Sequence, residues 1–342
     1  MAQSTHAPGP ETLLVMDHGT FETQFDAQRL ERLRSLVRVG TPVSTDSLAD
    51  PAVAGRLADV EILVTSWGVP MLDEAQLARL PKLKAVFHCA GTVRPFVSAA
   101  LWNRGIIVSN GADANAIPVA EFTLATIILA GKRAQVLAND ARTHKGSNNY
   151  GHLRGELGNV GRTVGVVGYS RIGRRVVELL QMLQDVRVLV ADPYADPAEV
   201  AAAGATLLPL EELIPAVDIL SLHAPELPST RHMIGASELA ALADDATLIN
   251  TGRGSLIDTV ALEEACRSGR ITAILDVTDP EPLNADSILY ELPNVVLTPH
   301  VAGSLGTETR RMSDMALNDL AHYLNNEPLD AQVHAADLGL SA

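Results

Sequence analysis

The sequence of 342 residues is poor in cysteine, in aromatic residues and in positive charge. Its two cysteines, Cys89 and Cys266, are too few for a disulfide framework, and free thiols are typical of a reducing cytoplasm. Aromatic residues make up 4%, which leaves little for stacking on single-stranded nucleic acid. Lysine and arginine number 26 against 41 acidic residues, and the formal charge of −15 repels nucleic-acid phosphates and anionic membranes. We therefore expect a cytoplasmic protein without a nucleic-acid partner.

Long apolar runs are also lacking. The longest, around Leu124–Ala130, falls far short of the roughly 18 residues that span a bilayer. Residues 1–10 have neither the basic start nor the apolar stretch of a signal peptide and are interpreted as a short tail. We expect no membrane partner. The length suggests two domains, at about 150 residues per domain. An anionic substrate would need positive charge placed locally in its site.

Short apolar runs alternate with helical patterns in the first third of the chain, as in βαβ units around a parallel sheet. A long helix is predicted over Ile117–Thr143, with Pro118 in its first turn, and a loop over Gly146–Gly161. The predicted strands of this part are Thr12–Asp17, Glu61–Ser66, Leu83–Cys89 and Ile106–Val108, and the predicted helices are Phe25–Arg34, Leu72–Leu80 and Phe96–Arg104.

A second α/β series begins at Thr163, and a final helix over Thr307–Asn326 is placed to return to the first domain. The predicted fold is therefore α/β, with two doubly wound, Rossmann-like domains facing across a cleft. The nucleotide domain, 113–303, is inserted in a discontinuous substrate domain, 1–112 and 304–342. The predicted strands of the second series are Thr163–Gly168, Val186–Asp192, Ala205–Leu208, Asp218–His223, Thr247–Asn250, Ile271–Val277 and Val295–Pro299, and its helices are Ile172–Gln184, Ala236–Leu242 and Thr259–Ser268.

The segment Thr163–Gly173 predicts a strand, a tight turn and a helix whose N-terminus faces a pyrophosphate. Gly168 and Gly173 stand at the first and third glycine positions of the dinucleotide fingerprint, and Ser170 replaces the second. Asp192 follows 19 residues after Gly173, where an acid accepts hydrogen bonds from the adenosine ribose. Asp192 would repel a 2′-phosphate, so we predict NAD rather than NADP. A generic β–α turn is the alternative.

Three later segments place polar residues directly after predicted strands, where open α/β sheets bind ligands. They are Asn250–Gly254, Asp276–Pro282 and Thr298–Gly303. Together they bring a guanidinium, carboxylates and an imidazole to one sheet edge. A guanidinium binds a carboxylate bidentately, and an imidazole oriented by a carboxylate passes a proton near neutral pH. The alternative is a set of solvated loop charges.

These segments, in this order and together with Val119–Glu121 and Ser221–Pro225, resemble the D-isomer-specific 2-hydroxyacid dehydrogenases. The resemblance extends from about Thr12 to Asn326. It implies an NAD-dependent oxidoreductase that interconverts a small D-2-hydroxy acid and its 2-oxo acid. It also implies a homodimer joined through the nucleotide domains.

The resemblance implies that Arg253 binds the substrate carboxylate and polarises the 2-oxo group. His300 would exchange the proton with the substrate oxygen, and Glu281 would pair with that histidine. Asp276 would contact the nicotinamide carboxamide, and His223 is expected to line the cofactor rather than to act in catalysis. The full set of predicted cofactor-binding residues is Gly168, Ser170, Arg171, Ile172, Gly173, Asp192, His223, Ala224, Pro225, Thr230, Thr251, Gly252 and Asp276.

In the first domain the family has a loop whose N–H groups hold the substrate carboxylate, and here Ala90, Gly91 and Thr92 match it. Many members carry a Gly-x-Asp-Asn-like run where this chain has Thr92–Pro95. Arg94 within that run would bind a second anionic group or pair on the surface. Trp67 would form another wall of the site or pack in the core. The side chain of the substrate therefore stays open.

Two other functions compete with this hypothesis. A non-catalytic NAD-sensing scaffold has no physical need for Arg253, Glu281 and His300 together. A formate dehydrogenase transfers hydride without an acid–base step, and its members place Gln where this chain has Glu281. The short C-terminus argues against a long allosteric phosphoglycerate dehydrogenase. No clustered Cys/His spacing indicates zinc, so no metal is predicted.

Overall fold

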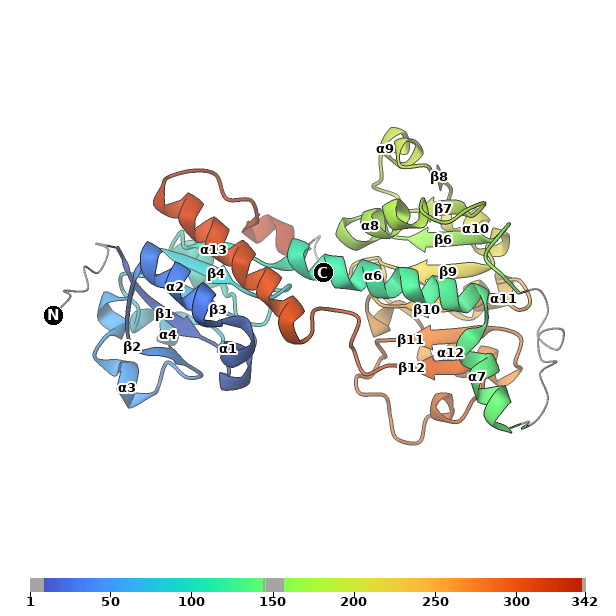
Figure 1. Cartoon of the computed structure of the whole chain (residues 1–342), viewed down its shortest axis with the longest axis horizontal. Coiled ribbons are helices and arrows are strands. Elements are labelled where there is room, and N and C mark those ends of the chain that lie inside the picture. The colour runs from blue at the N-terminus through green and yellow to red at the C-terminus, as the bar shows by residue number, and fades with distance from the viewer. Residues whose placement is uncertain (1–8, 144, 146–156, 340–342) are drawn as a thin grey trace. The chain divides into compact units, whose positions relative to one another are not determined.

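The computed structural model describes residues 9–143, 145 and 157–339, which divide into two α/β units (Figure 1). The first unit comprises Met1–Asn115 and Ser304–Leu340, and the second comprises Ala116–Gly303. The chain passes from the first to the second along helix α6 (Ala112–Gly131). The predicted N-terminal tail and most of the predicted loop Gly146–Gly161 lie outside the described residues.

The first unit is built on a sheet whose described strands run in the order β13-β5-β4-β3-β1-β2. All neighbouring strands are parallel except β13 and β5. Helices cover both faces, so the inner strands β1, β3 and β4 are buried along their whole length. The strands are β1 (Glu11–Val15), β2 (Arg38–Thr45), β3 (Ile62–Thr65), β4 (Ala85–His88), β5 (Ile107–Asn110) and β13 (Gln332–Val333); the helices are α1 (His18–Gln24), α2 (Ala27–Leu36), α3 (Pro51–Ala54), α4 (Glu74–Ala78), α5 (Ala99–Asn103) and α13 (Arg310–Leu324), with short 3₁₀ turns η1 (Leu57–Asp59), η6 (Gly306–Thr309) and η7 (Ala335–Gly339).

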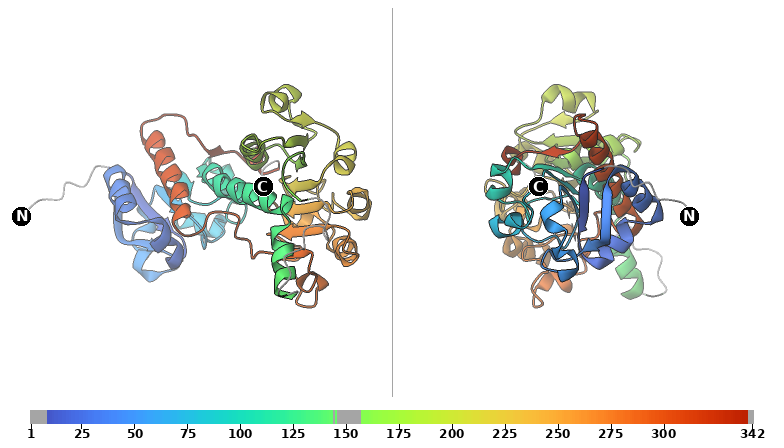
Figure 2. Two further views of the ribbon diagram at one scale, coloured as in Figure 1. Left: turned by 45° about the vertical axis from the view of Figure 1, so that its right-hand side comes forward. Right: turned by 90° about the vertical axis from the view of Figure 1, so that its left-hand side faces the viewer.

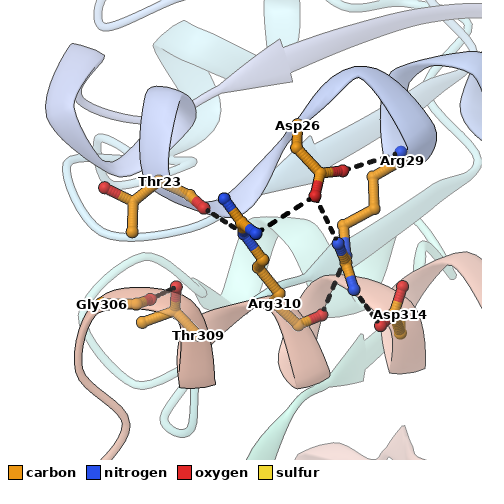
Figure 3. A network of polar contacts seen from close by, with 7 residues as sticks. All are labelled: Thr23, Asp26, Arg29, Gly306, Thr309, Arg310 and Asp314. Atoms are coloured by element: carbon orange, nitrogen blue, oxygen red, sulfur yellow. Dashed lines mark hydrogen bonds and ion pairs between the residues drawn. The ribbon is translucent and has the colours of Figure 1, made fainter.

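Helix α13 belongs to this unit although it follows the whole of the second unit in sequence (Figures 1 and 2). Its apolar side packs into the core beside strand β4 through Ala316, Leu317 and Leu320. Figure 3 shows its polar tether to α2: Arg29 pairs with Asp314 at 2.5 Å and donates to the backbone carbonyl of Arg310 at 3.3 Å. The last helix is therefore fixed to elements near the N-terminus by both apolar and charged contacts.

The second unit contains a parallel sheet whose described strands run in the order β12-β11-β10-β9-β6-β7-β8. Counted from β6, its first six strands have the order 3-2-1-4-5-6 of the dinucleotide-binding fold, which puts the topological switch point between β6 and β9. Val164 and Val166 of β6 face one core cluster, and Val167 faces the other. The strands are β6 (Thr163–Val167), β7 (Arg187–Ala191), β8 (Thr206–Leu207), β9 (Ile219–Leu222), β10 (Thr247–Asn250), β11 (Thr272–Leu275) and β12 (Val295–Leu297); the helices are α7 (Ala134–Thr143), α8 (Arg171–Leu180), α9 (Pro197–Ala202), α10 (Leu210–Leu213), α11 (Ala236–Ala241) and α12 (Thr259–Arg267), with 3₁₀ turns η3 (Ile214–Ala216), η4 (Gly254–Leu256) and η5 (Ile288–Tyr290).

The strands predicted for the second unit are confirmed to within one or two residues. The prediction of one long helix over Ile117–Thr143 is wrong, because the chain breaks into α6 and α7 at Arg133, whose φ is 49°. Helix α6 also begins at Ala112, so Pro118 lies inside the helix and not in its first turn. The three alanines and the short polar side chains between Ala112 and Pro118 extend the helix backwards.

Helix α6 also differs from the expectation about apolar runs. Among the described residues it is the one helix long and apolar enough to cross a membrane by length and composition. Of its most apolar 18-residue window, 56% is buried inside the protein. A buried core helix meets the same criterion, and α6 contributes Ala120 and Ile127 to a core cluster of the second unit.

Candidate active site

The turn between β6 and α8 combines two glycines that no larger residue can replace without displacement. Gly168 has a φ of 94°, and a Cβ there would lie 2.5 Å from the backbone nitrogen of Ala224. A Cβ on Gly173 would collide with the Gly168 carbonyl oxygen. Ser170 is the N-cap of α8 but makes no side-chain capping hydrogen bond. The first-turn N–H groups of Ile172 and Gly173 are therefore available to an anion.

Asp192, at the end of β7, is held against this turn. One carboxylate oxygen accepts a hydrogen bond from the Tyr169 backbone at 2.7 Å, and the other accepts from the Tyr194 backbone at 2.8 Å. The side chain is half-buried. The structure thus brings the predicted ribose-binding acid beside the turn that contains Gly168 and Ser170. Sequence spacing alone does not specify this proximity.

The loop after β9 faces the same turn across the switch point. His223 is buried, its Nε2 lies 2.8 Å from the Ser221 hydroxyl, and its Nδ1 has no hydrogen-bond partner. Burial lowers the pKa of this imidazole to about 3, so His223 is neutral at physiological pH and is unsuited to proton transfer. The Thr230 hydroxyl donates to the carbonyl of Pro225 at 2.6 Å and closes the loop on itself.

Arg253 lies in a tight loop after β10 that is braced by Asn250. The Asn250 side chain donates to the Arg253 carbonyl at 2.8 Å and accepts from the Gly252 N–H at 3.0 Å. The Thr251 hydroxyl lies 2.9 Å from that of Thr123 on α6. The half-buried Arg253 guanidinium donates to the Gly252 carbonyl at 2.8 Å. Its backbone is therefore firmly placed at the carboxyl edge of the sheet.

Asp276 organises the loop that carries His300. Its buried carboxylate accepts hydrogen bonds from the Thr298 hydroxyl at 2.6 Å, from the Val301 N–H at 2.8 Å and from the Ala302 N–H at 2.9 Å. The Asp276 carbonyl also accepts from the His300 N–H at 2.9 Å. The hydrogen bonds of this carboxylate thus hold the histidine loop, a role that the sequence does not predict. Its predicted contact with the cofactor stays a prediction.

His300 and Glu281 form a close pair. Nδ1 of His300 lies 2.6 Å from Oε1 of Glu281, and about half of each side chain is exposed. His300 has a φ of 54°, an uncommon conformation for a residue other than glycine that is often found at functional sites. Because a carboxylate only accepts, Nδ1 carries the proton of this hydrogen bond and Nε2 does not take part in it.

The loops of Arg253 and of the His300–Glu281 pair are neighbours on parallel strands. Asn250 of β10 pairs with Leu275 of β11, and a Cβ on Gly254 would collide with the Thr278 carbonyl. The structure thus brings the two loops into close contact at one sheet edge, as the strand-end positions predict.

In the first unit, the predicted carboxylate-binding loop follows β4. Backbone hydrogen bonds hold this loop: the Cys89 N–H donates to the Thr65 carbonyl at 2.6 Å, and the Gly111 N–H donates to the Ala90 carbonyl at 2.9 Å. Among the described residues, the N–H groups of Ala90, Gly91 and Thr92 have no hydrogen-bond acceptor. Three neighbouring amides without acceptors form a cradle of the kind that binds anions.

Buried His88 supports this loop from beneath. Its Nδ1 lies 2.9 Å from the Thr65 hydroxyl, and the ring also bonds to the backbone of Thr92. Burial lowers the pKa of His88 to about 3.

Arg94 and Trp67, the other predicted substrate-binding residues of the first unit, are both exposed. The exposed fraction of Trp67 is 45%, so the alternative that Trp67 packs in the core is wrong.

Two supporting residues, Asn250 and Thr298, are absent from the predicted site. Both stood next to predicted residues, directly at the ends of strands, and that position is the signal that points to them. Their roles depend on hydrogen bonds across loops that sequence spacing does not specify.

Comparison with known proteins places this geometry in a family. Residues 124–302 match the model of the D-isomer specific 2-hydroxyacid dehydrogenase NAD-binding domain. The chain is 36% identical over 253 residues to the D-3-phosphoglycerate dehydrogenase of Mycobacterium leprae, covering 73% of this chain and 46% of that protein. It is 35% identical over 259 residues to the glyoxylate reductase of Aeropyrum pernix, covering 74% of this chain and 76% of that protein. The chain spans about half the length of the curated phosphoglycerate dehydrogenases it matches.

Among solved structures, D-mandelate dehydrogenase of Rhodotorula graminis has the same fold, with a TM-score of 0.81 at 24% identity over 96% of this chain and 98% of that one. The predicted fold class, two Rossmann-like α/β domains, and the predicted cofactor, NAD, are confirmed by these matches. The chain belongs to the D-isomer-specific 2-hydroxyacid dehydrogenase family.

Proposed function

We propose that this chain is an NAD-dependent oxidoreductase that interconverts a small D-2-hydroxy acid and its 2-oxo acid. The observation that carries the proposal is the 2.6 Å contact between His300 and Glu281. This acid–base pair lies on loops of the same unit that holds the NAD-binding turn. A scaffold that only senses NAD has no use for such a pair, and a formate dehydrogenase has no proton step.

The residues present fit NAD. Gly168 and Gly173 leave room for a close backbone approach, α8 offers uncapped N–H groups for the pyrophosphate, and Asp192 is placed for the ribose hydroxyls. The cofactor, when bound, would supply the hydride chemistry at the substrate C2. The Asp192 carboxylate repels a 2′-phosphate, which favours NAD over NADP.

His300 moves the proton. In reduction, protonated Nε2 donates to the 2-oxo oxygen as that oxygen gains negative charge; in oxidation, neutral Nε2 takes the hydroxyl proton. Glu281 keeps Nδ1 protonated and fixes the ring orientation, because it accepts from Nδ1. Asp276 acts on this step indirectly, since its three hydrogen bonds hold the loop that presents His300.

The substrate carboxylate is bound by Arg253 and by backbone amides. The guanidinium offers a bidentate contact and draws electron density from the adjacent 2-oxo group. In the first unit the amides of Ala90, Gly91 and Thr92 supply further donors. Arg94, exposed on the same loop, suits a second anionic group on the substrate.

We also propose that the chain forms a homodimer through its NAD-binding unit. Leu129 on α6, Leu157 and Val160 are exposed apolar side chains, with exposed fractions of 42%, 40% and 73%. Their two segments lie side by side, because the Gly158 N–H donates to the Gly131 carbonyl and the Asn159 side chain donates to the Ile128 carbonyl. An apolar surface of this kind is typical of an interface between subunits.

The experiment that tests the activity follows NADH oxidation with glyoxylate, hydroxypyruvate, pyruvate, phenylpyruvate, 2-oxoglutarate and 3-phosphohydroxypyruvate. Each is assayed with NADH and with NADPH, and formate with NAD is included. We expect turnover of at least one 2-oxo acid, faster with NADH. If the protein binds NADH but turns over none of these compounds, the proposed activity is contradicted and the non-catalytic NAD-sensing scaffold is favoured. If it turns over formate alone, the acid–base role is contradicted.

A further inference from the structure

Asp319, His322 and Asp330 form a cluster in the first unit, apart from the candidate active site. Asp319 and His322 lie three residues apart on α13 and therefore share one face of the helix. The chain turns after α13, where the Glu327 N–H donates to the His322 carbonyl at 2.8 Å, and brings Asp330 back to the helix. One nitrogen or oxygen atom from each of the three side chains lies within 4.8 Å of the other two.

Two buried atoms of the cluster have no hydrogen-bond partner. Asp319 is fully buried; its Oδ1 accepts from the Asp330 N–H at 2.8 Å, but its Oδ2 is unpartnered. Nδ1 of His322 is likewise unpartnered and lies 3.7 Å from Oδ2 of Asp330. The hydroxyl of Ser109, itself without a hydrogen-bond partner, and the backbone N–H of Ala331 lie near the Asp319 carboxylate. Buried polar atoms without hydrogen-bond partners are rare, because burying them costs free energy. These two atoms therefore indicate a place where a ligand binds.

The charge of the cluster indicates the sign of that ligand. Among the described residues, no lysine or arginine pairs with Asp319 or Asp330. Two carboxylates and one imidazole thus lie together without a lysine or arginine, and the neutral imidazole and both carboxylates each have a lone pair to offer. A divalent metal ion supplies the missing charge and accepts all three lone pairs.

The spacing suits a small metal ion. Two ligands about 2.0–2.1 Å from a tetrahedral zinc ion lie roughly 3.3 Å apart, so the 3.7 Å between His322 and Asp330 closes with a small side-chain movement. The Asp330 N–H on Oδ1 of Asp319 fixes that carboxylate and leaves Oδ2 to the metal, as outer hydrogen bonds do in metal sites. The side chains of His322 and Asp330 are 33% and 65% exposed, which gives an ion a path to the site.

We propose that Asp319, His322 and Asp330 bind a divalent transition-metal ion, best zinc, with water as the fourth ligand. The ion joins α13 to the segment that leads into edge strand β13. Because β13 pairs with β5, with Gln332 opposite Ser109, the metal stabilises the edge of the first-unit sheet. The site is independent of NAD and of the proposed reaction.

The test measures zinc binding by the full chain. The protein is stripped with a chelator, desalted and dialysed against graded concentrations of free zinc, and bound metal is counted by mass spectrometry. The variants His322→Ala and Asp330→Asn remove one ligand each. His232→Asn is the matched control. Nδ1 of His232 lies 4.0 Å from Asp258, and its Nε2 lies 3.8 Å from Asp279. Because the two carboxylates lie at opposite nitrogens of the ring, they cannot both share a metal ion with the same nitrogen. Asparagine also tolerates the positive φ of residue 232.

We expect one zinc per wild-type chain and per control chain, and an affinity at least about tenfold lower in both ligand variants. Zinc should also raise the unfolding temperature of the wild type and of the control by several degrees, and this shift should vanish in the ligand variants. Circular dichroism shows whether the variants fold. No stoichiometric zinc in the wild type, or undiminished zinc in both folded ligand variants, overturns the proposal.

Discussion

Three histidines at strand ends differ in their exposure to solvent, and this difference separates their roles. His88 and His223 are 3% and 5% exposed, whereas the side chain of His300 is 51% exposed. Burial lowers the pKa of the first two to about 3, so they stay neutral and serve as hydrogen-bonding supports. Only His300 among these three has both a carboxylate partner and a side chain that is half exposed to solvent.

The buried histidines predict a loss of stability in acid. Their folded pKa of about 3 lies below the unfolded value of 6.5, so the unfolded chain binds protons that the folded chain does not. Stability is therefore full above pH 6.5 and falls as the pH drops from there towards 3. Between pH 7 and 5 each histidine should remove about 2 kcal/mol from the free energy of unfolding.

His88→Gln tests this value in the first unit, where both tryptophans, Trp67 and Trp102, report unfolding. Urea denaturation followed by their fluorescence should show a smaller loss between pH 7 and 5 in the variant, by about 2 kcal/mol. His18→Gln, at an exposed histidine, is the control and should keep the wild-type loss. An equal loss in His88→Gln and the wild type would show that His88 is not neutral in the folded chain.

At the scale of elements, the strands of the second unit were the most predictable part, because parallel strands buried on both faces are continuous apolar runs. Strand β2 is not predicted: it lies at the sheet edge, is only partly buried and contains Gly40 and Pro42. The break at Arg133 is not predicted either, although Gly131 ends α6 two residues before it, because an isolated glycine does not by itself end a helical pattern. The placement of the site loops follows from strand ends, but the hydrogen bonds of Asp276 and Asn250 depend on tertiary contacts.

The β6–α8 turn allows a sharp test at this scale. Gly168→Ala would force a Cβ against the Ala224 backbone in a left-handed conformation, so the loops on both sides of the switch point must separate. We expect the Kd for NADH, measured by fluorescence titration, to rise at least about tenfold, since the helix N-terminus loses its place against the pyrophosphate.

Gly269→Ala is the matched control, because Gly269 also has a positive φ, of 73°, but a Cβ there meets no atom within 4 Å. It should share the cost of the strained backbone and keep NADH affinity. If both variants lose affinity equally, general destabilisation explains the effect and the proposed role of the turn is wrong.

At the scale of the whole molecule, the charge of −15 describes the surface and not the site. Each unit carries local donors that suit an anion: the Arg253 guanidinium and the N-terminus of α8 in the second unit, and the amides of the Ala90–Thr92 loop in the first. The net charge therefore predicts that nucleic-acid phosphates are repelled, and it does not oppose a small carboxylate.

The proposed homodimer predicts a particle of twice 36.3 kDa in light scattering after size-exclusion chromatography. Val160→Asp places a charge on the apolar surface of Leu129, Leu157 and Val160 and should shift the protein towards the monomer. Val260→Asp, on α12 with an exposed fraction of 77%, is the control and should leave the dimer intact. A Val160→Asp protein that remains a dimer places the interface elsewhere.

The central claim is that His300, paired with Glu281, moves the proton in a 2-oxo acid reduction. The most direct measurement compares kcat of His300→Ala with that of the wild type on the best substrate, with NADH affinity measured on the same preparations. The account predicts kcat lower by at least about 10²-fold with an unchanged Kd for NADH. A kcat within a few-fold of the wild type would contradict it.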